Sequence, residues 1–131
     1  VRRAGIDYWH LVTLRLHPDF GSFAGRHKGG VKLFSANGRK SYLEAEFRPG
    51  DALVFGKEST GLAREVTDLF PDEAYGIPTA GAVRSLNLAS AVAIVVYEAM
   101  RATGALDGAA PEPVCEGLRD HRPLPGVRLR G

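Results

Sequence analysis

The chain has 131 residues, of which 44% are hydrophobic and 24% charged, so it is long enough for one domain with a real core and is neither disordered nor fibrous. Its single cysteine, Cys115, excludes an internal disulfide framework and a multi-cysteine zinc site, and we expect no bound metal. The net charge of +2 is unevenly spread, because residues 1–50 carry nine Lys and Arg against four Asp and Glu, which suits either a polyanionic partner such as RNA or an ordinary solvated surface.

Strand and helix patterns alternate along the first hundred residues. Short apolar runs bounded by Gly or Pro predict strands, and apolar residues at helical spacing predict helices. In chain order we predict a helix over Pro18–Arg26, strands over Val31–Ala36 and Asp51–Gly56, a helix over Gly61–Phe70, a strand over Ala74–Pro78 and a helix over Leu86–Thr103, with Tyr42–Phe47 left open. This order favours an α/β domain with a largely parallel sheet and helices on both sides.

Details of two elements follow from their composition. Asp51–Gly56 is continuously apolar, which is typical of a strand covered on both faces. For the helix over Gly61–Phe70, Ser59 or Thr60 is available as N-cap, and Pro71 ends the helix.

The end of the chain differs in kind from the rest. Residues 107–131 are rich in Gly, Pro and Arg and have no period, so we predict a domain over residues 1–106 followed by a flexible tail. The longest apolar run is far short of the roughly 20 residues that a membrane span needs. We therefore expect no membrane partner, and the lack of a disulfide framework fits a reducing, cytoplasmic location.

The segment LVFGKESTGL, residues 53–62, runs from a strand through Gly56 and Glu58 into a helix start. In open α/β sheets, ligands bind beyond the carboxyl ends of strands, where Gly56 would let a flat ring or a backbone approach closely. The alternative is a plain turn that needs Gly for its geometry and Glu58 for the helix dipole.

The segment IPTAGAVRSLNLAS, residues 77–90, places polar groups directly before a helix that is apolar almost all round. Ser85 or Asn87 could simply cap that helix, but Arg84 and both side chains together exceed what a cap needs. The helix itself must be covered on every side, by its own domain or by a second copy of it, and we predict a homodimer interface on it that includes Val95 and Val96. A ligand-binding loop and a cap are therefore both open from the residues alone.

These two segments resemble the second and third motifs of the SpoU branch of the SPOUT RNA methyltransferases. The opening RRAGIDYW and the closing VVYEAMRATG are most similar to the small tRNA wobble-position 2′-O-methyltransferases, which act on cytidine or uridine. The resemblance implies a SPOUT fold with a C-terminal deep trefoil knot near residues 80–88, S-adenosylmethionine as cofactor, tRNA as partner and a homodimer through the C-terminal helix.

The resemblance also implies roles for individual residues. The cofactor contacts of the family fall on Ala36, Gly56, Ile77 and Ser85. The positions near the reacting ribose are Glu58, Ser85 and Asn87, and Tyr97 matches a position at the dimer interface beside the active site.

One departure from the family pattern concerns the start of the sequence. The family opens with a strand and an Asn-Thr-Gly-Asn type motif that carries a catalytic Arg, and this sequence begins after that point. The resemblance thus implies that the usual N-terminal part is absent here, with the general base upstream of Val1. Two rival functions remain open, namely a ribosomal RNA 2′-O-methyltransferase of the same branch and a non-catalytic RNA-binding module with the same fold.

Overall fold

The computed structural model describes residues 9–80 and 86–110. Within them, four parallel strands form one sheet in the order β2-β4-β1-β3. The strands are β1 (Val31–Phe34), β2 (Lys40–Ser41), β3 (Ala52–Phe55) and β4 (Ala74–Gly76). In register, Val31 lies beside Ala52 and Leu33 beside Ala74, so β1 is paired on both edges.

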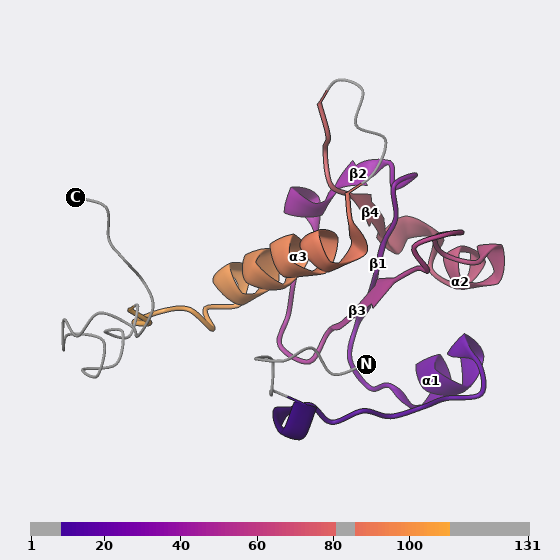
Figure 1. Ribbon diagram of the computed structural model, residues 1–131, viewed down its shortest axis with the longest axis horizontal. Helices are drawn as coiled ribbons and strands as arrows, with labels where there is room; N and C mark the ends of the chain where they lie inside the picture. Colours follow the sequence, from indigo (N-terminus) through magenta and orange to yellow (C-terminus); the bar gives the residue numbers. More distant parts are fainter. Residues whose placement is uncertain (1–8, 81–85, 111–131) are drawn as a thin grey trace, which may run out of the picture.

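Three α-helices and three short 3-10 turns surround this sheet. They are α1 (Phe20–Arg26), α2 (Arg64–Leu69), α3 (Leu88–Ala102), η1 (Trp9–Leu11), η2 (Tyr42–Glu44) and η3 (Pro71–Glu73). Figure 1 shows α3 on one side of the sheet and α1 and α2 on the other. The predicted α/β architecture with a parallel sheet is therefore confirmed. No helix in the described ranges has the length and apolar character of a membrane span.

The predicted start of the second helix is wrong. α2 begins at Arg64, three residues later than predicted, and its N-cap is Ala63, which makes no side-chain capping bond. Gly61 has a φ of +68°, a left-handed conformation that cannot belong to a right-handed helix, so neither Ser59 nor Thr60 can cap it. The predicted end is confirmed, because Pro71 begins the next turn, η3.

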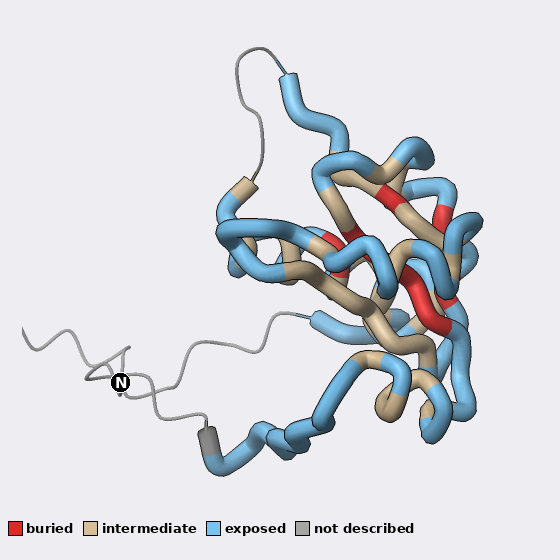
Figure 2. Tube along the Cα trace, turned by 90° about the vertical axis from the view of Figure 1, so that its right-hand side faces the viewer, coloured by how far each residue is buried: buried red, intermediate tan, exposed pale blue. Residues whose placement is uncertain are grey.

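The apolar run of β3 predicted a strand covered on both faces, but the strand that is buried throughout is β1. All four residues of β1 are buried, whereas all four of β3 are only half-buried. β3 lies at the edge of the sheet, where one side of the strand has no neighbouring strand to cover it. In Figure 2 the buried segments lie within the folded part of the chain, with exposed loops around them. An apolar run does not tell a central strand from an edge strand.

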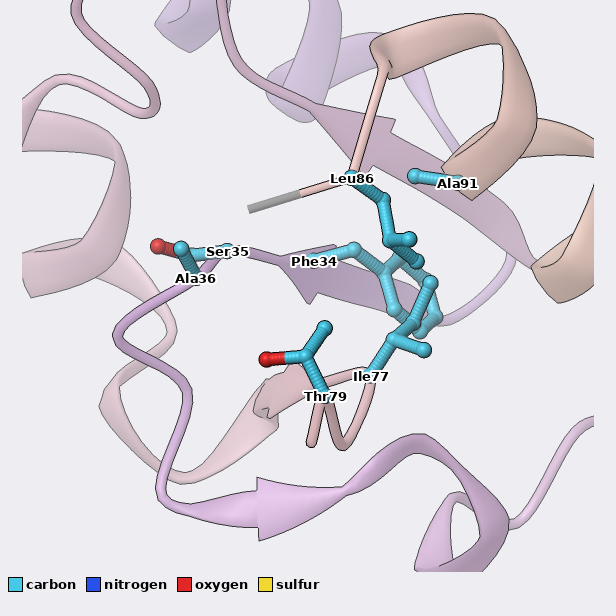
Figure 3. Close-up of a pocket in the computed structure, with 7 residues that line it drawn as sticks. All are labelled: Phe34, Ser35, Ala36, Ile77, Thr79, Leu86 and Ala91. Atoms are coloured by element: carbon cyan, nitrogen blue, oxygen red, sulfur yellow. The ribbon is translucent and has the colours of Figure 1, made fainter. Parts of the chain in front are cut away.

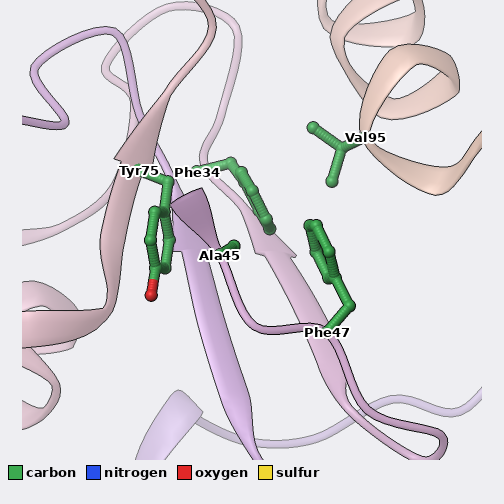
Figure 4. Packing of buried hydrophobic residues seen from close by; sticks show 5 residues of the cluster. All are labelled: Phe34, Ala45, Phe47, Tyr75 and Val95. Carbon is green, nitrogen blue, oxygen red and sulfur yellow. The ribbon is translucent and has the colours of Figure 1, made fainter. Parts of the chain in front are cut away.

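The core lies between the sheet and α3 (Figure 4). The ring of Phe34 has its centroid 5.2 Å from that of Phe55, 6.2 Å from that of Phe47 and 6.0 Å from that of Tyr75. Val95 of α3 closes this cluster and is completely buried. Burial of these large side chains fixes α3 over the sheet, because apolar area removed from water stabilises by roughly 25 cal/mol per Å².

At the amino ends of the strands, Lys32 and Asp51 form a buried ion pair with the partly exposed Glu73 beside it. Lys32 lies 3.4 Å from the Oδ2 of Asp51 and 3.6 Å from the Oε2 of Glu73. The hydroxyl of Tyr75 donates a hydrogen bond of 2.9 Å to Glu73, and burial together with that carboxylate raises the pKa of Tyr75 to about 12. The cluster ties β1, β4 and η3 together at the amino ends of the strands, away from the cavities described next.

Candidate functional site

The carboxyl ends of β1 and β4 open into a small cavity of about 110 Å³. Its lining combines the end of β1, the segment after β4 and the start of α3, namely Phe34, Ser35, Ala36, Ile77, Thr79, Leu86 and Ala91. Figure 3 shows the side chains of Phe34, Ile77 and Leu86 pointing toward one another, with Ser35, Ala36 and Thr79 around the remaining space. The arrangement offers a largely apolar slot, which suits a flat aromatic ligand.

A second and larger cavity of about 540 Å³ adjoins the first and shares Ser35, Ala36 and Leu86 with it. Its further lining is mostly polar, from the segment after β3 and from the cap of α3, and comprises Asn37, Lys57, Glu58, Thr60, Gly61, Leu62, Asn87 and Leu88. The two cavities together form one site with an apolar end and a polar end.

The segment after β1 is held tightly against β4. Ser35 donates its backbone N–H to the carbonyl of Tyr75 at 2.9 Å, and Gly38 donates its N–H to the carbonyl of Ser35 at 3.0 Å. A Cβ on Gly38 would lie 2.2 Å from the carbonyl carbon of Tyr75, so only glycine allows this crossing. The crossing fixes Ala36 at the junction of the two cavities.

Gly56 permits a close approach, as predicted, but the group that comes close is the backbone of Gly61 in the following loop and not a ligand. A Cβ on Gly56 would lie 2.1 Å from the carbonyl carbon of Gly61. Lys57 and Gly61 close this loop with reciprocal backbone hydrogen bonds of 3.1 and 2.8 Å, and the closed loop presents Glu58 to the second cavity. Gly56 is not among the described residues that line either cavity, so its predicted cofactor contact stays a prediction.

Changing Gly56 to Ala should destabilise the domain by about 1–3 kcal/mol, because the added methyl group must push the backbone of Gly61 away. Gly25 in α1 is the matched control, since a Cβ there meets nothing within 4 Å. A thermal melt should show a lower melting temperature for Gly56→Ala and an unchanged or higher one for Gly25→Ala. Equal melting temperatures would show that the loop yields without cost.

Asn87 is the N-cap of α3, as one of the two interpretations of its motif predicted. Its Oδ1 accepts hydrogen bonds from the backbone N–H of Ala89 at 2.9 Å and of Ser90 at 3.4 Å. With Oδ1 held by the helix, the Nδ2 amide has no hydrogen-bond partner among the described residues, and Asn87 lines the second cavity. The side chain can therefore cap the helix and donate to a ligand at the same time.

The other predicted site residues do not all come together. Glu58 lines the second cavity with Asn87, and Ala36 and Ile77 line the first. Tyr97 lies ten residues along α3 from Asn87, about 15 Å by helical rise, and is 65% exposed. Ser85 lies outside the described residues.

Sequence reasoning missed five lining residues of the first cavity, Phe34, Ser35, Thr79, Leu86 and Ala91. All but Ala91 lie within two residues of a predicted site position, so the signal was proximity to a motif and not a pattern of its own. Within residues 9–80 and 86–110, no group of three or more His, Cys, Asp or Glu side chains is placed to hold a metal ion.

Comparison with known proteins finds one family and a consistent set of relatives. A model of the SpoU rRNA methylase family matches residues 1–97. A tRNA (cytidine(34)-2′-O)-methyltransferase of Burkholderia pseudomallei (strain 1106a) is 37% identical over 113 residues, which cover 83% of this chain and 72% of the relative. The enzyme of that name from Escherichia coli (strain K12) is 35% identical over 107 residues, covering 79% and 68%.

Two solved structures are similar as well. One, a putative RNA methyltransferase from Bacillus anthracis, has a TM-score of 0.69 and 33% identity. The other, from work on the 2′-OH methylation of C/U34 on tRNA, has a TM-score of 0.67 and 48% identity. In each case the match covers 77% of this chain and 66% of the solved chain, so the chain spans about two thirds of their length.

Proposed function

This chain belongs to the SpoU rRNA methylase family, and from that premise we propose that it methylates a ribose 2′-hydroxyl of tRNA, at wobble nucleotide 34. The observation that carries the proposal is the pair of adjoining cavities at the carboxyl ends of β1 and β4, one apolar and one polar. Relatives and one solved structure whose names concern methylation at this position support the choice of tRNA over ribosomal RNA.

We propose S-adenosylmethionine as the methyl donor. The first cavity fits its adenine end, because Phe34, Ile77 and Leu86 offer apolar surface beside the backbone at Ala36. The polar second cavity fits the amino-acid end and leaves room for the acceptor ribose. When bound, this group supplies an electrophilic methyl carbon.

The residues of the site then have separable tasks. Ala36 is small enough to leave the junction of the two cavities open. Asn87 uses its Nδ2 amide to orient the ribose, while its Oδ1 keeps the start of α3 in place. The loop closed by Lys57 and Gly61 holds Glu58 toward the acceptor. A 2′-hydroxyl is a poor nucleophile at neutral pH, so alignment of this kind accounts for much of the expected acceleration.

The experiment is transfer of a labelled methyl group to RNA. We expect incorporation into tRNA, and none into the same tRNA made with 2′-deoxyribose at nucleotide 34. Incorporation into ribosomal RNA fragments alone would support the rival enzyme. Tight binding of tRNA without any transfer would support a non-catalytic module. Either result would reject the proposed function.

The deep trefoil knot and the cytoplasmic location stay predictions. The knot depends on the path of residues 81–85, which lie outside the described residues. Similarity to solved RNA methyltransferases supports the fold as a whole.

We also propose that the chain forms a homodimer through α3, although through a different face than its sequence indicated. Val95 and Val96 were the expected interface residues, but Val95 is completely buried in its own core. The exposed apolar side chains of α3 are Ile94, at 36% exposure, and Tyr97, at 65%. They share a helix face with the exposed Ala93, which leaves an apolar surface for a second copy.

Changing Ile94 to Glu should give a folded monomer, because the new charge lies on the proposed interface and not in the core. Sedimentation should show the monomer mass, and the melting curve should remain cooperative. Leu69→Glu, at an exposed apolar residue of α2, is the matched control and should leave the dimer intact. A stable dimer of Ile94→Glu would exclude this face.

A further inference from the structure

A groove lies between α1 and the extended segment that precedes it. None of the proposed catalytic residues lines this groove. It is open and measures about 590 Å³. Its lining residues come from residues 15–18 and from one side of α1 with its C-cap, namely Arg15, Leu16, His17, Pro18, Ser22, Phe23, Arg26 and His27. We call this the α1 groove.

The α1 groove is basic, because its lining includes the two arginines Arg15 and Arg26 and no acidic residue. The acidic residue beside it in the sequence is Asp19. Asp19 is engaged locally, because its Oδ1 accepts a hydrogen bond of 2.7 Å from the backbone N–H of Ser22. That bond holds the pKa of Asp19 below its usual value, so its single negative charge persists and, against two arginines, leaves the groove with a positive balance.

The two arginines of the groove, Arg15 and Arg26, are exposed, and their guanidinium groups have no partner among the described residues. Neither Arg15 nor Arg26 forms an ion pair or a side-chain hydrogen bond with any residue in the described ranges. Two other exposed arginines are paired: Arg101 lies 2.6 Å from Glu98, and Arg48 lies 4.0 Å from Glu46. Exposed cations with no local partner are available for an external anion.

The wall that carries these charges is ordered by aromatic contacts. The ring of Phe23 meets His17 edge-on at 5.4 Å between centroids and stacks on His27 at 5.3 Å. The Nε2 of His27 donates to the carbonyl of Gly30 at 3.1 Å, which fixes the ring. A preorganised wall loses less conformational entropy on binding than a flexible one.

The α1 groove lies at the opposite end of the strands from the two cavities. α1 leads into the amino end of β1, whereas the cavities begin at its carboxyl end, a separation of about 13 Å along the four residues of the strand. A small molecule bound in the cavities cannot reach the groove. A folded RNA can contact both, and its phosphates repeat along the chain.

We propose that the α1 groove binds the phosphodiester backbone of the RNA substrate, through Arg15 and Arg26, away from the nucleotide that is methylated. This inference rests on the proposed function for the identity of the substrate. Contacts of this kind position an RNA without reading its sequence. They should therefore set the affinity for RNA and leave the affinity for the methyl donor unchanged.

The test compares two double variants with the same change in net charge. Arg15→Gln with Arg26→Gln alters the groove, and Arg48→Gln with Arg64→Gln alters two exposed arginines outside it and outside the proposed dimer interface. We measure the dissociation constant for tRNA between 50 and 200 mM salt, the affinity for S-adenosylmethionine, and kcat and KM for methyl transfer. A thermal melt of each variant checks that it is folded. We expect no loss of stability in the groove variant, because neither arginine contributes an ion pair or a side-chain hydrogen bond within the described residues.

The groove variant should bind tRNA more weakly, and the slope of log affinity against log salt should fall by about 1 for each arginine. Its KM for tRNA should rise while kcat at saturating tRNA stays constant. Arg15→Lys with Arg26→Lys should restore most of the binding, because it retains the charge. The outside variant should behave as wild type.

Two results would overturn the inference. If both double variants change tRNA binding equally, net charge alone is responsible. If the wild-type protein methylates tRNA and the groove variant binds tRNA normally, the groove serves another partner, such as an acidic protein, while the proposed function stands. If the protein binds tRNA through the groove but transfers no methyl group, the proposed function fails and the inference survives.

Discussion

Changing Asn87 to Asp should lower methyl transfer to tRNA by about 100-fold while the melting temperature stays the same or rises slightly. A carboxylate caps a helix as well as an amide does, and its negative charge is favourable at a helix N-terminus. What Asp cannot supply is the Nδ2 donor, which has no partner among the described residues and lines the second cavity. The measurement is labelled methyl incorporation beside a melt of the same preparation.

Two further substitutions separate the roles of Asn87. Asn87→Ser retains the cap without adding charge and should lose activity like Asp, which excludes repulsion from Glu58 as the cause. Asn87→Ala removes the cap as well and should cost about 1 kcal/mol of stability in addition. If Asn87→Asp transfers methyl groups at the wild-type rate, Asn87 is a helix cap and nothing more.

Changing Val95 to Glu should lower the melting temperature by more than about 10 °C or unfold the domain. Val95 is completely buried against the cluster that contains Phe34 and Phe47, so the carboxylate would have neither water nor a cation beside it. A buried charge without a partner costs about 3–5 kcal/mol, against a total stability of about 5–15 kcal/mol for a domain. Circular dichroism during heating measures the loss.

Ile94→Glu is the control for this second prediction as well, because it introduces the same group at the next position of the same helix. The structure predicts opposite outcomes, with loss of the fold at position 95 and loss of the dimer at position 94. If the two variants have the same melting temperature, the assignment of the buried face of α3 is wrong.

The sequence predicted elements well where a local pattern decides them. β1 and α3 were predicted to within two residues, because an apolar run bounded by Gly and a capped, Gly-terminated helix are local signals. β2 was not predicted, since two residues carry no period. The late start of α2 depends on the left-handed conformation of Gly61. The close contact between Gly56 and Gly61 imposes that conformation, and the composition of the segment does not show it.

Burial and the composition of the site were harder to predict than the elements. α3 is apolar almost all round, so nothing in its spacing distinguishes Val95, which is buried, from Ile94, which is exposed. Resemblance to a family indicated Ala36, Ile77 and Asn87, and all three line the cavities. Leu86 lines both cavities as well, but only the folded chain brings it beside Phe34.

The strand order has a consequence for how the chain folds. Both neighbours of β1 come from distant parts of the sequence, since Val31 pairs with Ala52 and Leu33 with Ala74. Parallel pairings of this kind form slowly, because loop entropy must be lost before the contacts are gained. Until β4 arrives, β1 exposes an apolar edge that favours aggregation. The first cavity needs Ile77 beside Phe34, so it exists only after that last pairing, and a ligand bound there would favour the completed sheet by mass action.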